Sequence, residues 1–157
     1  VSGNYGATKF LMEKLFTQFE ETNPKVKYRV VRLGNIIYSI DSVLCKWKKL
    51  IEDCKEVIVT DKRATRFFMT SEESIDSILN CFENAKDSKP YFEPMKSTSI
   101  GNLLQAMINK YLPKDCDLPI KTIGLQPSEN LHEKITEDGV FTNEIEQYTV
   151  KELEEMV

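Results

Sequence analysis

The sequence predicts an α/β fold in which helices cover a mostly parallel sheet. Segments whose apolar residues recur at helical spacing alternate along the chain with short apolar, β-branched segments, a pattern typical of this class. Breaks at Asn23-Pro24 and Lys89-Pro90 separate such segments. The 157 residues, of which 41% are hydrophobic, suit one domain that buries roughly 70% of its unfolded surface.

The first half of the chain contains two predicted helices and two predicted strands. Residues 6–21 are predicted to form a helix that ends before Asn23-Pro24, because the residue preceding a proline is pushed out of the helical region. A strand over residues 28–33 follows. Apolar residues at helical spacing then predict a helix over residues 43–54, and a β-branched run predicts a strand over residues 57–60.

The second half continues the alternation. Thr70 and Glu73 form a capping box, so a helix is expected to begin there. This helix is expected to bury the apolar side chains Ile75, Ile78, Leu79 and Phe82. The other predicted elements are an extended segment at 66–69, a strand at 91–93, a helix at 103–111, a strand at 120–125, a short helix at 131–135 and a second capping box, Thr149 with Glu152, in the acidic tail.

Composition excludes several classes of partner. The formal charge is -4, with lysines and carboxylates interspersed, which leaves no basic stripe for a nucleic acid backbone. No apolar run approaches the roughly 18 residues that span a bilayer, and the N-terminus lacks a basic segment followed by an apolar one. We therefore expect no nucleic acid partner, no membrane association and a cytoplasmic location.

The cysteines give no sign of a metal or redox site. They are far apart in the sequence, without the close pairing that such sites require. A chain of this length does not depend on disulfides. We expect no bound metal and free, buried thiols at Cys45, Cys54, Cys81 and Cys116.

Tyr5 and Lys9 open the first predicted helix, one turn apart on one face. A tyrosine acts as an acid or base near neutral pH only if its pKa, about 10 when unperturbed, is lowered, and a neighbouring ammonium lowers it. The spacing is also common on ordinary helices. The pair alone therefore leaves a catalytic and a structural role open.

The glycines bear on the cofactor that such a tyrosine would need. A nucleotide cofactor requires a glycine-rich turn between a strand and a helix, so that backbone amides can approach its pyrophosphate. The six glycines form no such cluster. If Tyr5 is catalytic, we expect the cofactor-binding half upstream of Val1 or on another chain, and a first residue other than Met fits a fragment.

Four blocks of sequence occur in a recognisable order. They are Tyr5-Gly-Ala-Thr-Lys9, Val-Arg-Leu-Gly-Asn at 31–35, Thr-Asp-Lys-Arg-Ala-Thr-Arg-Phe-Phe-Met-Thr at 60–70 and Ile-Gly-Leu-Gln-Pro-Ser-Glu-Asn-Leu-His-Glu at 123–133. This order resembles the extended short-chain dehydrogenase/reductase superfamily. More narrowly, it is similar to the inverting UDP-N-acetylglucosamine 4,6-dehydratases of bacterial polysaccharide and flagellin-sugar biosynthesis.

The resemblance implies a fold and a division of the chain. It implies the C-terminal part of a Rossmann-like NAD(P)-binding fold with a smaller substrate-binding subdomain. The chain would then be a single α/β unit that is a fragment of a longer enzyme. Residues 1–60 would end the Rossmann-like part, and residues 61–157 would mainly bind substrate.

The resemblance also implies a reaction on a UDP-sugar. Tyr5 would deprotonate the C4 hydroxyl while NADP or NAD takes the hydride from C4. The resulting ketone acidifies the C5 hydrogen, a base removes it, the C6 hydroxyl leaves as water, and the stored hydride returns to C6, which gives a 4-keto-6-deoxy sugar nucleotide. Lys9 would lower the pKa of Tyr5 and bind the ribose hydroxyls of the cofactor.

Further ligand contacts follow from the same resemblance. Gly34 and Asn35 end a predicted strand and would meet the nicotinamide and the sugar, at a place where the crevice rule independently favours ligands. Arg66 would bind the UDP pyrophosphate, with a surface arginine beside a strand as the plain alternative. The remaining substrate-binding candidates are Ser42, Thr65, Gln126 and Glu129.

Other conspicuous residues have plainer explanations. His132 is the single histidine, and without a partnered motif it is expected to be structural. Trp47 and the Phe67-Phe68 pair are expected in the core.

Two departures from the family pattern concern substrate affinity. Residues 38–45 read Tyr-Ser-Ile-Asp-Ser-Val-Leu-Cys where the family usually has Gly-Ser-Arg-Gly-Ser-Val-Ile-Pro. Residues 126–130 read Gln-Pro-Ser-Glu-Asn in place of Arg-Pro-Gly-Glu-Lys. Ile40 and Gln126 thus replace arginines, and two lost contacts of about 1.5–3 kcal/mol each would weaken UDP-sugar binding by more than about tenfold.

Three functions stay open from the sequence. The first is a nucleotide-sugar 4,6-dehydratase; in this case the 157-residue chain alone is expected to be inactive. The second is a UDP-sugar 4-epimerase of the same superfamily, which returns hydride to C4. The third is a degenerate domain that only binds a partner or maintains an oligomer. Association into a homo-oligomer is an expectation from the superfamily.

Overall fold

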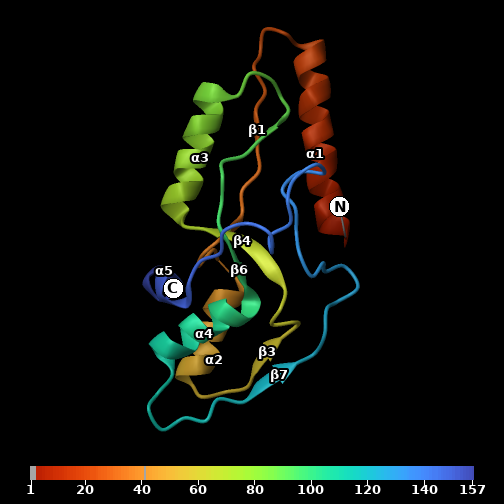
Figure 1. Cartoon of the computed structure of the whole chain (residues 1–157). Coiled ribbons are helices and arrows are strands. Elements are labelled where there is room, and N and C mark those ends of the chain that lie inside the picture. Colours follow the sequence, from red (N-terminus) through yellow and green to blue (C-terminus); the bar gives the residue numbers. More distant parts are fainter. Residues whose placement is uncertain (1–2, 41) are drawn as a thin grey trace. The chain divides into compact units, whose positions relative to one another are not determined.

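The structure is a computed structural model that describes residues 3–40 and 42–157 (Figure 1). It confirms the α/β class, because helices alternate with short strands along the chain. The chain divides into two compact units, Val1–Leu33 with Ser71–Pro94 and Gly34–Thr70 with Met95–Val157. These units interleave along the sequence, and the functional boundary near residue 60 stays a prediction.

The first unit consists of a short parallel strand pair with two helices. Its elements are α1 (Gly3–Thr22), β1 (Val30–Val31), α3 (Ser71–Asn84) and β5 (Pro90–Tyr91). The helix α1 ends directly before Asn23-Pro24, as predicted. Two ion pairs tie α1 to the segment around β1: Glu13 Oε2 lies 2.6 Å from Arg32 Nη2, and Glu20 Oε1 lies 2.9 Å from Arg29 Nη1.

The buried face of α3 differs from the prediction. The helix buries Ser74, Ser77 and Cys81, and the Cys81 thiol donates to the carbonyl of Val30 in β1 at 3.7 Å. Small side chains allow the helix to lie close to this strand, so the apolar stripe turns away. The expectation that this stripe is buried is therefore wrong for the described chain, where its exposed members are Ile75, Ile78, Leu79 and Phe82.

The second unit contains two small sheets and three helices. Its elements are β2 (Asn35–Ile36), α2 (Val43–Glu52), β3 (Val57–Val59), β4 (Thr65–Met69), β6 (Ser97–Ser99), α4 (Ile100–Tyr111), β7 (Ile120–Thr122) and α5 (Val150–Met156). Strand β4 pairs with β2 in parallel and with β6 in antiparallel, and β3 pairs with β7 in parallel. Within the described chain, three of the four strand pairings are parallel.

The core of the second unit lies among α2, α4, α5 and the strands β3 and β4. Trp47 and Phe68 belong to it, as predicted, and Phe67 is also buried. The helix α5 begins with the predicted capping box of Thr149 and Glu152. Among the described residues, no helix combines the length and hydrophobicity needed to cross a bilayer.

Residues 131–135 do not form the short helix that was predicted. Their main chain bonds elsewhere: the carbonyl of Leu131 accepts from Thr65 N at 2.9 Å, and the carbonyl of Glu133 accepts from Thr142 N at 2.9 Å. A helix over 131–135 would need the Leu131 carbonyl for its own first bond, because that carbonyl accepts from the N–H four residues later. The helix prediction is therefore wrong, because tertiary pairing takes the backbone groups.

Tyr38 has a left-handed backbone, with φ of 56°, at a position where the family pattern usually has glycine. A side chain in this region costs free energy that glycine avoids. Contacts of the Tyr38 side chain offset part of this cost. Its Oη donates to Tyr111 Oη at 3.1 Å, and Lys48 Nζ lies 5.9 Å from the centroid of its ring. Burial and the Tyr111 contact raise the pKa of Tyr38.

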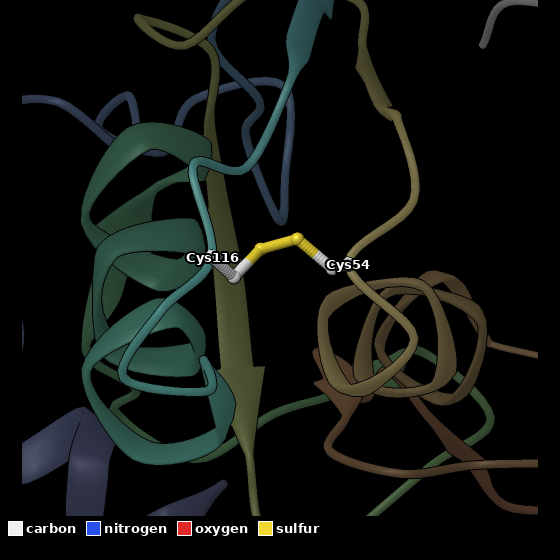
Figure 2. Close-up of a disulfide and its surroundings, with 2 residues drawn as sticks. All are labelled: Cys54 and Cys116. Carbon is white, nitrogen blue, oxygen red and sulfur yellow. A yellow bond between two sulfur atoms is a disulfide. The ribbon is translucent and has the colours of Figure 1, made fainter.

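A disulfide joins Cys54 to Cys116, with 6.0 Å between their Cα atoms (Figure 2). The expectation of four free buried thiols is wrong for this pair. Because Val57 of β3 lies opposite Ile120 of β7, the residues that precede these two strands are brought together. Cys81 is free and buried, as expected, whereas Cys45 is free but exposed.

We predict that replacing both Cys54 and Cys116 by alanine lowers the free energy of unfolding by about 2–4 kcal/mol, because the bond closes a long loop in the unfolded chain. The two residues are 62 positions apart. Urea denaturation measures the change. Cys45→Ser, at an exposed free thiol, is the control and should leave the midpoint unchanged; an equal midpoint for all three proteins would contradict the prediction.

Candidate functional site

The helix α1 of the first unit carries Tyr5 and Lys9 one turn apart. Tyr5 is 76% exposed, and Lys9 Nζ lies 5.4 Å from the centroid of its ring. The hydroxyl of Thr8 donates to the carbonyl of Tyr5 at 2.7 Å and turns back onto the helix. The structure thus brings the two predicted catalytic residues together on a surface that a ligand can reach.

Gly34 and Asn35 lie at the start of the second unit, beside β4. A Cβ atom on Gly34 would stand 3.1 Å from Phe67 Cβ and 3.2 Å from Met95 Sδ, so a side chain there would push β4 away. Asn35 lies opposite Phe68 in the ladder, and its Nδ2 donates to the carbonyl of Phe67 at 2.9 Å. Both residues have a packing role, and their contact with a cofactor stays a prediction.

Three further candidates occupy local turns. Ser42 is the N-cap residue of α2 but makes no side-chain cap bond, and its Oγ lies 3.5 Å from Cys45 Sγ. Gln126 and Glu129 close one turn, because Gln126 N donates to Glu129 Oε2 at 2.9 Å and Glu129 N donates to the Gln126 carbonyl at 2.9 Å.

Thr65 stands at the centre of a buried polar cluster. Its hydroxyl lies 2.7 Å from His132 Nδ1 and 2.6 Å from Thr142 Oγ1. The Thr142 hydroxyl also accepts from Glu133 N at 2.9 Å and donates to the Thr65 carbonyl at 3.2 Å. Ser97 Oγ donates to the carbonyl of Thr142. The cluster fastens residues 131–133 to β4, and His132 serves this structure.

Arg66 follows Thr65 on β4 and is largely buried, with 14% of its side chain exposed. Its Nη1 donates to the carbonyls of Thr65 and Leu131, at 2.8 and 3.2 Å. Its Nε lies 3.1 Å from Glu133 Oε1. Arg66 is therefore more than the exposed surface arginine considered as its plain alternative.

The remaining nitrogen of Arg66, Nη2, makes no hydrogen bond to another described residue. No buried side-chain nitrogen or oxygen among these residues lacks a partner, so Nη2 keeps some contact with solvent. A guanidinium end that reaches solvent from a fixed side chain is suited to an anion such as phosphate.

Glu133 and Thr142 were absent from the predicted site. Burial raises the pKa of Glu133, and the nearby Arg66 guanidinium opposes that rise. The sequence carried one signal for Glu133, since it ends the Leu-His-Glu block of the family pattern. Thr142 stands outside every block, and only the fold reveals its contacts.

Solved structures define the class of this fold. Pen from Bacillus thuringiensis matches 98% of this chain and 56% of its own chain, with a TM-score of 0.85 and 22% identity. A UDP-N-acetylglucosamine 4-epimerase from Methanobrevibacter ruminantium, in complex with UDP-N-acetylmuramic acid, matches 97% of this chain and 51% of its own, with a TM-score of 0.67 and 17% identity. The fold is thus part of the Rossmann-like short-chain dehydrogenase/reductase fold.

The family is more specific than the fold. A family model for polysaccharide biosynthesis proteins matches residues 2–153, and the chain belongs to this family. An inverting UDP-N-acetylglucosamine 4,6-dehydratase from Campylobacter jejuni is 34% identical over 92% of this chain. A UDP-glucose 4-epimerase from Rickettsia bellii is 28% identical over 83% of it. The chain spans 42% of that dehydratase and 38% of that epimerase, less than half of either.

We predict that Thr142→Val lowers the free energy of unfolding by about 1–3 kcal/mol, because buried polar groups lose their partner. The fully buried Thr142 serves Glu133 N and the Thr65 carbonyl. Urea denaturation measures the loss. Thr122→Val, on an exposed residue of β7, is the matched control. If Thr142→Val lowers the free energy of unfolding no more than this control does, the polar cluster does not contribute to stability.

Proposed function

We propose that the chain is the substrate-binding part of a nucleotide-sugar 4,6-dehydratase, which converts UDP-N-acetylglucosamine to a 4-keto-6-deoxy sugar nucleotide. The observation that carries the proposal is the exposed pair of Tyr5 and Lys9 on one face of α1. The 34% identity to a dehydratase supports the choice of reaction.

Tyr5 takes the proton of the sugar C4 hydroxyl, as a general base within reach of its substrate. The Lys9 ammonium places a positive charge beside the phenol and favours the charge that forms there. NADP or NAD, when bound, supplies the transient oxidation at C4. Of the three residues expected to hold it, Lys9 and Asn35 are exposed, whereas Gly34 is packed against Phe67.

Arg66 binds the pyrophosphate of the UDP group through Nη2, the one nitrogen of its guanidinium that no other described residue holds by a hydrogen bond or ion pair in the contacts given above. The carbonyls of Thr65 and Leu131 hold the other terminal nitrogen, so Thr65 serves the substrate by fixing Arg66. Ser42, Gln126 and Glu129 are proposed as neighbours of the sugar nucleotide. Ile40, where the family usually has arginine, is 93% exposed and brings no charge to this group.

A UDP-sugar 4-epimerase is the second candidate, and the similarity to an epimerase at 28% identity supports it. Both reactions begin with oxidation at C4, but the epimerase retains the C6 hydroxyl. The missing arginines at Ile40 and Gln126 favour the third candidate, a degenerate domain that binds a partner or maintains an oligomer.

We also propose that the chain is located in the cytoplasm, and its disulfide offers a way to test this. Reducing compartments keep thiols free, whereas the structure holds Cys54 and Cys116 in a disulfide. The redox state of this pair in cells therefore bears directly on the location.

We predict that Tyr5→Phe abolishes product formation in a polypeptide that joins this chain to a glycine-rich cofactor-binding half. The phenylalanine keeps the ring and removes the group that exchanges the proton. The product is measured by NMR, in which a dehydratase generates a new C6 methyl signal and an epimerase leaves the C6 hydroxymethyl group intact.

Tyr28→Phe, at a tyrosine that packs on the rings of Phe16 and Phe19, is the control and should retain activity. Undiminished turnover by Tyr5→Phe would remove Tyr5 from the mechanism. A C4-inverted product without the new C6 methyl signal would replace the dehydratase with the epimerase.

A further inference from the structure

We propose that Glu133 is a positioning residue, which holds the Arg66 guanidinium so that Nη2 faces a diphosphate ester. This inference rests on the proposed function, because it assumes that Arg66 meets the pyrophosphate. It assigns Glu133 a task in binding that goes beyond its place in a family motif.

The guanidinium is held at two of its three nitrogens. The Glu133 carboxylate lies beside Nε, at 3.1 Å, and two carbonyls accept from Nη1. Such contacts fix both the position of the planar group and its rotation about its own axis. Nη2 is then the one nitrogen of the guanidinium to which no other described residue offers a hydrogen-bond acceptor.

The groups that hold Arg66 are themselves fixed. Thr142 forms hydrogen bonds with both backbone groups of Glu133. The N–H of Glu133 donates to Thr142 Oγ1, and its carbonyl accepts from Thr142 N, each at 2.9 Å. The Leu131 carbonyl also accepts from Thr65 N at 2.9 Å. The Glu133 side chain therefore extends from a rigid backbone, which is what a supporting residue at a binding site requires.

Removing the charge of Glu133 distinguishes a positioning role from two others, competition with the ligand and stabilisation of the fold alone. The carboxylate offsets the charge of Arg66, so attraction to an anion depends on directed hydrogen bonds more than on net charge. If Glu133 competed with the ligand for Arg66, its removal would strengthen binding. If Glu133 served only stability, its removal would leave affinity unchanged. Positioning alone predicts that a variant without a side-chain oxygen beside Nε binds more weakly.

The experiment measures the affinity of the 157-residue chain for UDP-N-acetylglucosamine by calorimetry. This ligand carries a diphosphate ester whose charge is constant near neutral pH. Four variants are compared with the natural chain: Arg66→Ala, Glu133→Ala, Glu133→Gln and, as a matched control, Glu137→Gln at an exposed carboxylate of the same segment. Thermal unfolding checks that each variant is folded.

We expect Arg66→Ala to weaken binding about tenfold or more and Glu133→Ala to weaken it about threefold to tenfold. Glu133→Gln keeps the length of the side chain and an oxygen beside Nε but loses the charge, so its affinity should equal or exceed that of the natural chain. The excess should shrink as salt is added. Glu137→Gln should bind like the natural chain.

The outcomes separate the two proposals. Absence of binding by the natural chain, or full affinity in Arg66→Ala, would overturn the proposed contact with the substrate and the inference with it. Weak binding by Arg66→Ala together with full or increased affinity in Glu133→Ala would overturn the positioning role alone. If Glu133→Ala fails to fold, Glu133→Asp replaces it, since its shorter carboxylate should weaken binding, and unchanged affinity would overturn the role.

Discussion

In the second unit, the attachment of the segment around Glu133 to β4 depends on one buried hydroxyl, that of Thr142. It meets Thr65 in β4 and the backbone N–H of Glu133, and so joins three segments that are distant in the sequence. Without this hydroxyl, the backbone N–H of Glu133 would lose its hydrogen-bond acceptor. The position of this segment on β4, and with it the geometry of Arg66, follows from that constraint.

The same constraint connects the fold to the proposed chemistry. A long, charged side chain loses conformational entropy when a ligand orders it, and Arg66 has already lost much of that freedom to its contacts with Glu133 and two carbonyls. An anion that meets Nη2 then incurs little further ordering. If the proposed contact holds, this arrangement offsets part of the affinity that the neutral Ile40 and Gln126 would remove.

Periodicity predicted the places of α1, α2, α3 and α4. It gave the wrong buried face for α3, and the helix expected at 131–135 is not present. It could not predict β6, whose three residues are polar and gain their strand state from β4. Nor could it predict the Cys54–Cys116 bond, which follows from the pairing of β3 with β7. In the site, Tyr5, Lys9 and Arg66 stood in blocks of the family pattern, whereas Thr142 acts only through the tertiary structure.

The most direct test of the central claim is an NMR titration of the isotope-labelled chain with UDP-N-acetylglucosamine, followed at the guanidinium signals of the arginines. The held geometry predicts that the Arg66 signals are resolved before ligand is added, since the group is fixed, and that they shift on binding. Arg63, an exposed arginine whose Nη2 lies 2.8 Å from Asp61 Oδ2, should not shift. Equal shifts at both arginines, or a shift at Arg63 alone, would contradict a prepared anion contact at Arg66.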